Sequence, residues 1–192
     1  VGFGCSAELT KEQGAKDIVR AVGSKFGHLA RVYLNAGGNA AQQSIENVDT
    51  SAWTHTVEIN LYTAFHVAKA SLPLLKKSSH GQILTMGSGM GRRPYQTSSA
   101  YSAAKAGLWS LTQSLAIEFA QYGITVNEMI PGPVKANVPE GEKFEPYIVK
   151  EGAWENEWFK GAEDVVPMAV FLASQHRCGP SGQSFALNRR LL

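Results

Sequence analysis

The sequence has little cysteine, no long apolar run and no tract of one charge, and each absence argues against a class of protein. Cys5 and Cys178 are the only cysteines, too few for a disulfide framework or a cysteine-rich metal cluster. No apolar stretch approaches the length of a bilayer span. The net charge of +2 is spread without any run of more than two basic residues, which favours neither nucleic acid nor an acidic membrane as partner. We therefore expect no metal, no nucleic-acid or membrane partner, and a reducing cytoplasmic location.

What the sequence does contain is enough apolar material for one ordinary domain. Its 192 residues are 44% hydrophobic and 18% charged, so we expect a single domain over 1–192 with a full core. Short β-rich runs alternate with longer helical ones, which indicates βαβ units. The predicted fold class is therefore α/β, a doubly wound parallel sheet in three layers.

The periodicity gives approximate bounds for most elements. Strands are expected at 1–5, 30–38, 81–88, 124–134 and 182–188, and helices at 10–27, 50–77, 98–123 and 162–174. Thr10 is the expected N-cap of the first helix, while Gly27 and Gly123 mark two helix ends. The acidic, aromatic-rich segment between Lys135 and Gly161 has no clear period.

Two glycine-rich stretches invite comparison with a dinucleotide fingerprint, and both fail the test. The stretch 2–7 fits G-x-G-x-x-A, but no strand precedes it and no acidic residue closes a second strand. The stretch 87–91 follows a strand, but Arg92 occupies the sixth position and the next helix begins too late to meet a phosphate. Arg92 and Arg93 are either a solvated pair or an anion site. A serine-hydrolase elbow is also excluded, because Met86 stands where G-x-S-x-G needs glycine.

Tyr101 and Lys105 form a more informative pair. They lie four residues apart near the start of a helix, so both side chains project from one face. A nearby ammonium favours the phenolate, and the spacing therefore predicts a tyrosine pKa lowered toward neutrality. Such a group suits general acid–base chemistry on an alcohol or ketone. A lone Y-x-x-x-K motif also arises by chance, so its meaning depends on context.

That context is a set of motifs in a fixed order: "LNAG" at 34–37, Asn60 in "EINLYTAF", Ser88, Tyr101, Lys105, "PGPV" at 131–134, "AEDV" at 162–165 and "SGQSF" at 181–185. In order and spacing, the set resembles the short-chain dehydrogenase/reductase family over almost the whole chain. The resemblance implies a Rossmann-like sheet and hydride transfer between NAD or NADP and a carbonyl or secondary alcohol. It also implies a homodimer or homotetramer.

The resemblance assigns a role to each of four catalytic candidates. Tyr101 is the implied proton donor or acceptor. Lys105 would lower its pKa and hold the nicotinamide ribose. Ser88 would hydrogen-bond the substrate oxygen, and Asn60 would organise a water that relays protons.

Further residues are implied to bind cofactor or substrate. Besides Tyr101 and Lys105, the cofactor candidates are Glu8, Asn35, Ala36, Gly37, Pro131, Gly132 and Val134. The turn at 35–37 would lie next to the adenosine ribose, the turn at 131–134 would face the nicotinamide, and Glu8 would lie near the adenine. Besides Ser88, the substrate candidates are Met90, Tyr95, Pro133 and Trp154. The aromatics of 135–161 either line an apolar or cyclic substrate site or pack the segment onto the protein's own body or onto a neighbouring subunit.

The sequence departs from the family in one large respect. It reads as starting at the family's third strand, so we expect the first strand-helix-strand-helix segment, with half of the cofactor site, to be missing. The strand at 30–38 would then expose an apolar edge. Ala136 stands where the family commonly has threonine. The alternative to an oxidoreductase is a truncated, non-catalytic homologue that acts as a structural or regulatory subunit; a sugar-nucleotide epimerase is disfavoured by the compact C-terminal end.

Overall fold

The chain folds around a four-stranded parallel sheet, seen in a computed structural model that describes residues 2–135, 137–139, 142–152 and 154–189. The strands are β1 (Arg31–Leu34), β2 (Gln82–Met86), β3 (Thr125–Ile130) and β6 (Ser184–Ala186), in the order β1-β2-β3-β6. Leu34 pairs with Thr85, and Met86 pairs with Met129. The carboxyl ends of the strands therefore meet at one edge of the sheet.

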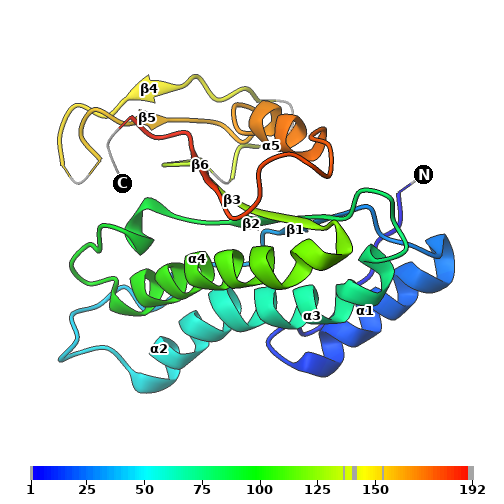
Figure 1. Cartoon of the computed structure of the whole chain (residues 1–192). Helices are drawn as coiled ribbons and strands as arrows, with labels where there is room; N and C mark the ends of the chain where they lie inside the picture. The colour runs from blue at the N-terminus through cyan, green and yellow to red at the C-terminus, as the bar shows by residue number, and fades with distance from the viewer. Residues whose placement is uncertain (1, 136, 140–141, 153, 190–192) are drawn as a thin grey trace.

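Helices cover both faces of this sheet (Figure 1). One face carries α1 (Glu12–Phe26), α2 (Thr50–Val57), the π-helical turn η1 (Glu58–Tyr62), α3 (Thr63–Leu75) and α4 (Ser99–Phe119). The other carries α5 (Val166–Ala173) and the small antiparallel pair of β4 (Tyr147–Ile148) and β5 (Trp158–Phe159). Two short 3-10 turns, η2 (Gly89–Gly91) and η3 (Ala120–Tyr122), complete the elements. The predicted three-layer α/β class is confirmed.

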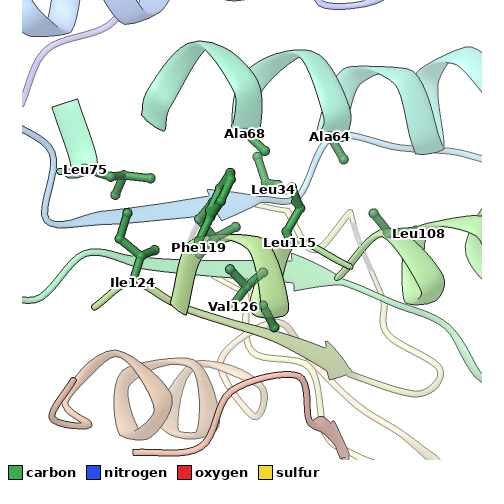
Figure 2. Close-up of a cluster of buried hydrophobic side chains, with 11 residues drawn as sticks. Leu34, Ala64, Ala68, Leu75, Leu108, Leu115, Phe119, Ile124 and Val126 are labelled. Carbon is green, nitrogen blue, oxygen red and sulfur yellow. The ribbon is translucent and has the colours of Figure 1, made fainter. Parts of the chain in front are cut away.

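The main core lies between the sheet and the α3–α4 layer (Figure 2). Leu75, Ile83, Leu108 and Val126 are each at most 2% exposed. Among the described residues, no helix is long and apolar enough to cross a bilayer. Leu108, Leu115 and Phe119 of α4 all belong to this core, so they form the face that docks the helix onto the sheet.

Two local predictions at the N-terminal end are wrong. Residues 2–5 form no strand, because none of the described residues pairs with them, and Phe3 instead packs on Phe26 with a ring-centroid separation of 6.5 Å. Helix α1 begins at Glu12 after Lys11, and not after Thr10, whose amide and hydroxyl both donate to the Glu8 carboxylate. The left-handed ends at Gly27 (φ 76°) and Gly123 (φ 67°) are as predicted.

Strand β1 has only β2 as a neighbour within the described part of the chain. Its other edge is unpaired there, as the sequence predicted. Tyr33 on this strand is 45% exposed. An unpaired edge of this kind is available for pairing with another strand.

Leu108 on α4 provides a test of the packing. We expect Leu108→Ala to lower the free energy of unfolding by about 2–5 kcal/mol, because the side chain is buried between α4 and the sheet. Ile117→Ala on the same helix is the control, since Ile117 is 79% exposed, and should change stability by less than about 0.5 kcal/mol. Urea unfolding measures both; equal losses would contradict the docking of α4 described above.

Candidate active site

The predicted site residues follow the carboxyl ends of three neighbouring strands. Residues 35–37 follow β1, Ser88 follows β2, and residues 131–134 follow β3. In open parallel sheets this edge is where ligands bind. Helix α4 reaches the same edge with its first two turns, which carry Tyr101 and Lys105.

Ser88 lies in extended conformation immediately before η2. Its hydroxyl accepts a hydrogen bond from the Met90 amide at 3.2 Å, which caps this short turn. Gly91 allows η2 to rest on α4, since a Cβ built there would lie 2.8 Å from the carbonyl carbon of Lys105. The loop that carries Ser88 and Met90 is therefore held directly against the turn of α4 that carries Lys105.

Lys105 connects α4 to the end of β2. Its Nζ donates to the Met86 carbonyl at 2.8 Å and lies 5.5 Å from the centroid of the Tyr101 ring. The side chain is buried, at 5% exposure. The hydrogen bond to Met86 uses one of three ammonium protons, so the amine can serve a further acceptor at the strand edge.

The pKa values of this pair differ from the prediction made for Tyr101. Burial raises the pKa of Tyr101 above its usual value, and hydrogen bonding by Ser88 opposes only part of that effect. Burial also lowers the pKa of Lys105 to about 8, against an opposing contribution from the Glu128 carboxylate. The predicted lowering of the tyrosine pKa is therefore wrong for this structure, because desolvation of the phenolate dominates.

Asn60 lies beneath the loop that follows β1, in the π-helical turn η1, and is 1% exposed. Its Nδ2 donates to the carbonyls of Gly38 (2.6 Å) and Thr56 (2.8 Å), and its Oδ1 accepts from the Gly38 amide at 3.2 Å. Single π-helical turns inside α-helices occur frequently at functional sites. Here the turn directs a buried amide to the strand edge.

Gly37 brings Asn60 and Lys105 together. A Cβ built on Gly37 would lie 2.5 Å from Asn60 Oδ1 and 3.5 Å from Lys105 Nζ. The loop can therefore lie this close to both polar groups only because residue 37 has no side chain. Asn35, Ala36 and Gly37 are all exposed, so this stretch could receive a ligand such as a ribose.

The turn after β3 completes the edge. Gly132 adopts a left-handed conformation (φ 74°), and Pro131, Pro133 and Val134 are half-buried beside it. Lys160 holds this turn from the segment before α5: its amide donates to the Pro133 carbonyl at 3.1 Å, and its Nζ would lie 3.2 Å from a Cβ on Gly132.

The remaining predicted residues lie in looser surroundings. Glu8 is exposed, and hydrogen bonds from Thr10 hold the pKa of its carboxyl below the usual value. Tyr95 is 43% exposed in the loop before α4. Trp154 is 44% exposed, with its ring 6.3 Å from that of Phe159. Roles for these residues in binding stay predictions, and Ala136 lies outside the described residues.

The aromatic residues of 135–161 pack on one another. Phe159 of β5 lies 5.5 Å from Tyr147 and 5.7 Å from Phe144, between ring centroids. These contacts lie within the segment itself, which favours packing of the aromatics inside the protein over a lining of a substrate site.

Sequence reasoning missed the buried partner of Arg92. Arg92 Nη1 and Nη2 donate to Glu128 Oε1 (3.0 Å) and Oε2 (2.6 Å), and Nη2 also donates to Ser184 Oγ at 2.7 Å. Glu128 is 0% exposed, so Arg92 is neither a solvated residue nor free to bind an anion. A carboxylate in the apolar run of β3 was the available signal, because a buried charge requires a partner. Within the described ranges, no group of three or more His, Cys, Asp or Glu side chains is placed to hold a metal ion.

Comparison with known sequences places the chain among the short chain dehydrogenases. A family model described as short chain dehydrogenase matches residues 3–144. An uncharacterized oxidoreductase of Staphylococcus epidermidis is 33% identical over 139 residues, which cover 72% of this chain and 60% of the relative. The chain thus spans about 60% of the length of the first curated relatives that it matches.

A second relative and one solved structure cover nearly all of the chain. A 2,3-dihydroxy-2,3-dihydro-p-cumate dehydrogenase of Pseudomonas putida is 30% identical, covering 95% of this chain and 71% of the relative. The crystal structure of an acetoin dehydrogenase from Salmonella typhimurium superposes with a TM-score of 0.84 at 21% identity, covering 94% of this chain and 72% of that one. This structural likeness concerns the fold.

Gly37 offers a direct test of the site geometry. We expect Gly37→Ala to lower the free energy of unfolding by about 1–3 kcal/mol, because its methyl group would collide with Asn60 Oδ1. Gly38→Ala is the matched control, since its methyl would meet only Ile59 Cδ1 at an ordinary 3.5 Å. Chemical denaturation of both variants decides the matter, and an unaffected Gly37→Ala protein would contradict the placement of Asn60.

The lowered pKa of Lys105 predicts a pH-dependent stability. Between pH 8 and pH 10.5 the unfolded chain keeps the Lys105 proton that the folded chain releases, so this residue makes stability rise with pH. The raised pKa of Tyr101 acts in the opposite direction above pH 10. From pH 8 to 10 we therefore expect the stability of the wild type relative to Lys105→Met to increase by on the order of 2 kcal/mol. Urea unfolding across this range measures the slope, and a flat difference would refute the assignment.

Proposed function

The chain belongs to the short-chain dehydrogenase family, and from that premise we propose that it forms the catalytic part of an oxidoreductase. The proposed reaction is hydride transfer between NAD or NADP and a carbonyl or secondary alcohol. The observation that carries the proposal is the convergence of Ser88, Tyr101, Lys105 and Asn60 on one sheet edge. Named relatives support it, among them a D-beta-hydroxybutyrate dehydrogenase of Rhizobium meliloti that is 34% identical over 128 residues.

Tyr101 is the proposed proton donor in the direction of carbonyl reduction. Its raised pKa keeps the phenol protonated at neutral pH, so the O–H bond is available to break as charge develops on the substrate oxygen. Ser88, whose hydroxyl lowers the pKa of the phenol against the effect of burial, would donate to the same oxygen and stabilise that charge. In alcohol oxidation the proton moves in the reverse direction.

Lys105 and Asn60 would supply the replacement proton. With a pKa of about 8, the Lys105 amine is mostly protonated at neutral pH and can exchange its proton with water. Asn60 Nδ2 fixes the loop at Gly38, and both Asn60 Oδ1 and Lys105 Nζ lie close to Gly37. A water bound beside these two groups would connect Lys105 with solvent.

The residues that follow β1 and β3 fit a dinucleotide. Asn35, Ala36 and Gly37 are exposed beside Lys105 Nζ, which has protons left for ribose hydroxyls. Pro131, Gly132 and Val134 form the turn that would meet the nicotinamide. When bound, the nicotinamide would supply or accept the hydride. Glu8 would lie toward the adenine.

The substrate is proposed only as a small molecule, and the assembly only as a homo-oligomer. Met90, Tyr95, Pro133 and Trp154 would contact a small-molecule substrate near Ser88. We propose a homodimer or homotetramer, since Tyr62, Phe65 and Trp109 leave 37–49% of their surface exposed on η1, α3 and α4. The exposed free thiols of Cys5 and Cys178 suit the reducing cytoplasm.

Substitution of Tyr101 tests the function. We expect Tyr101→Phe to lower kcat by about 10²–10⁴-fold, because the proton donor is lost while the ring remains. Ser88→Ala should likewise reduce turnover much more than cofactor affinity. Oxidation of NADH or NADPH with acetoin and 3-oxoacyl thioesters measures turnover, and fluorescence titration measures cofactor binding.

The control is Tyr122→Phe, an exposed tyrosine after α4 that should leave kcat unchanged. Full turnover by Tyr101→Phe would contradict the assigned role. A wild-type protein that binds cofactor but reduces and oxidises none of a broad panel of carbonyls and alcohols would favour the non-catalytic alternative.

A further inference from the structure

A buried ion pair lies directly beneath the loop that carries Ser88. The Glu128 carboxylate is held by two hydrogen bonds from Arg92 and one from the Ser184 hydroxyl, the latter at 2.5 Å. Arg92 in turn places its guanidinium carbon 4.6 Å from the centroid of the Trp109 ring on α4. The pair therefore connects the loop after β2 with β3, β6 and α4.

The carboxylate occupies the volume that a side chain at position 87 would need. A Cβ built on Gly87 would lie 2.6 Å from Glu128 Cγ and closer still to the carboxyl group. Gly87 stands between Met86, whose carbonyl accepts from Lys105, and Ser88. Its amide donates to the Met129 carbonyl at 2.8 Å. Glu128 thus packs against the peptide that separates the Lys105 acceptor from the proposed substrate-binding hydroxyl.

Packing alone does not explain a buried ion pair at this position. Taking two charges out of water costs free energy, and apolar residues of similar volume often give equal or greater stability. The pair therefore calls for a role beyond stability.

We propose that Glu128, oriented by Arg92, is a positioning residue of the active site, which fixes the Gly87–Ser88 turn and keeps a negative charge facing Lys105. This inference rests on the proposed function, because Lys105 must hold a proton at neutral pH to replenish Tyr101. Neither Arg92 nor Glu128 touches the reacting atoms, so both act through Lys105 and the Gly87–Ser88 turn.

The groups around Lys105 make the electrostatic effect specific. Tyr101 faces it from the same helix, Asn60 lies near it from η1, and Glu128 acts on it from β3, with Arg92 as the counter-charge of Glu128. Glu128 is the charged group that opposes the effect of burial on the pKa of Lys105. Removing its charge should leave that amine neutral over more of the physiological range.

The test is titration of the Lys105 amine in protein labelled with ¹⁵N-lysine, with Lys105→Met used to assign the signal. In Glu128→Gln we expect the pKa of Lys105 to fall by roughly one unit. Glu118→Gln is the matched control, since it makes the same exchange at an exposed position of α4, and should leave the titration unchanged. If the pKa of Lys105 is the same in Glu128→Gln and in the wild type, the proposal is overturned.

Kinetics provide the second measurement. Since the proposed proton supply requires protonated Lys105, we expect kcat to fall at high pH. In Glu128→Gln this fall should move to lower pH by the same amount as the pKa, whereas loss of packing alone would reduce kcat at every pH. If Glu128→Gln does not fold, the double variant Arg92→Met/Glu128→Leu removes the pair without leaving one charge unpaired. A smaller fall in the pKa of Lys105, in the same direction, is then expected, because the positive charge of Arg92 is removed as well. The two proposals can fail separately. If the pKa of Lys105 falls in Glu128→Gln but the wild-type protein transfers no hydride, the effect of Glu128 on Lys105 is supported and the proposed function is contradicted.

Discussion

Parallel pairing of β1, β2, β3 and β6 is the constraint on which the site depends. Because the strands share one direction, the loops after three of them open at the same edge of the sheet, although they lie far apart in the sequence. Helix α4 brings Tyr101 and Lys105 to that edge only if its position along strand β2 is fixed. Thr85 of β2 and Thr112 of α4 hydrogen-bond at 2.8 Å in the buried layer between them, and Lys105 binds the Met86 carbonyl at the end of the same strand. These two polar contacts, one within the buried layer and one at the end of the strand, therefore fix the register of α4 along β2.

Burial at this edge acts on Tyr101 and Lys105 in opposite directions, and both shifts favour the neutral group. The phenol keeps its proton more strongly, while the amine releases its proton near pH 8. A simple view of Lys105 as a cation that acidifies the tyrosine overlooks the desolvation of the amine itself. In this fold Tyr101 is therefore a weak acid, and Lys105 is a base that titrates near neutral pH. How much of Lys105 is protonated depends on the surrounding charges, and Glu128 is the one that raises its pKa.

The parts of the fold that follow from local pattern were predictable, and those that follow from distant contacts were not. Alternating strands and helices, the ends at Gly27 and Gly123, and the central catalytic candidates all follow from periodicity, turn chemistry and family motifs. The strand expected at 1–5 failed because strand propensity has no effect without a neighbouring strand to pair with. The role of Arg92 depends on a carboxylate 36 residues away, and the π-helical turn around Asn60 leaves no periodic signal within a helix of this length. Aromatic composition alone could not show whether the segment 135–161 packs on itself.

Three glycines at the strand edge share a physical reason that the sequence motif did not suggest. Glycines in such loops are usually explained by close approach of a phosphate or by left-handed backbone. Here the space at Gly37 is bounded by Asn60 Oδ1, that at Gly87 is filled by the Glu128 carboxylate, and that at Gly132 is bordered by Lys160 Nζ. Only Gly132 also has a positive φ. At Gly37 and Gly87 the contact leaves no room for a side chain, whereas at Gly132 the left-handed backbone is the stronger requirement. The glycines of this edge thus let polar groups of other elements lie directly against the main chain of the loops.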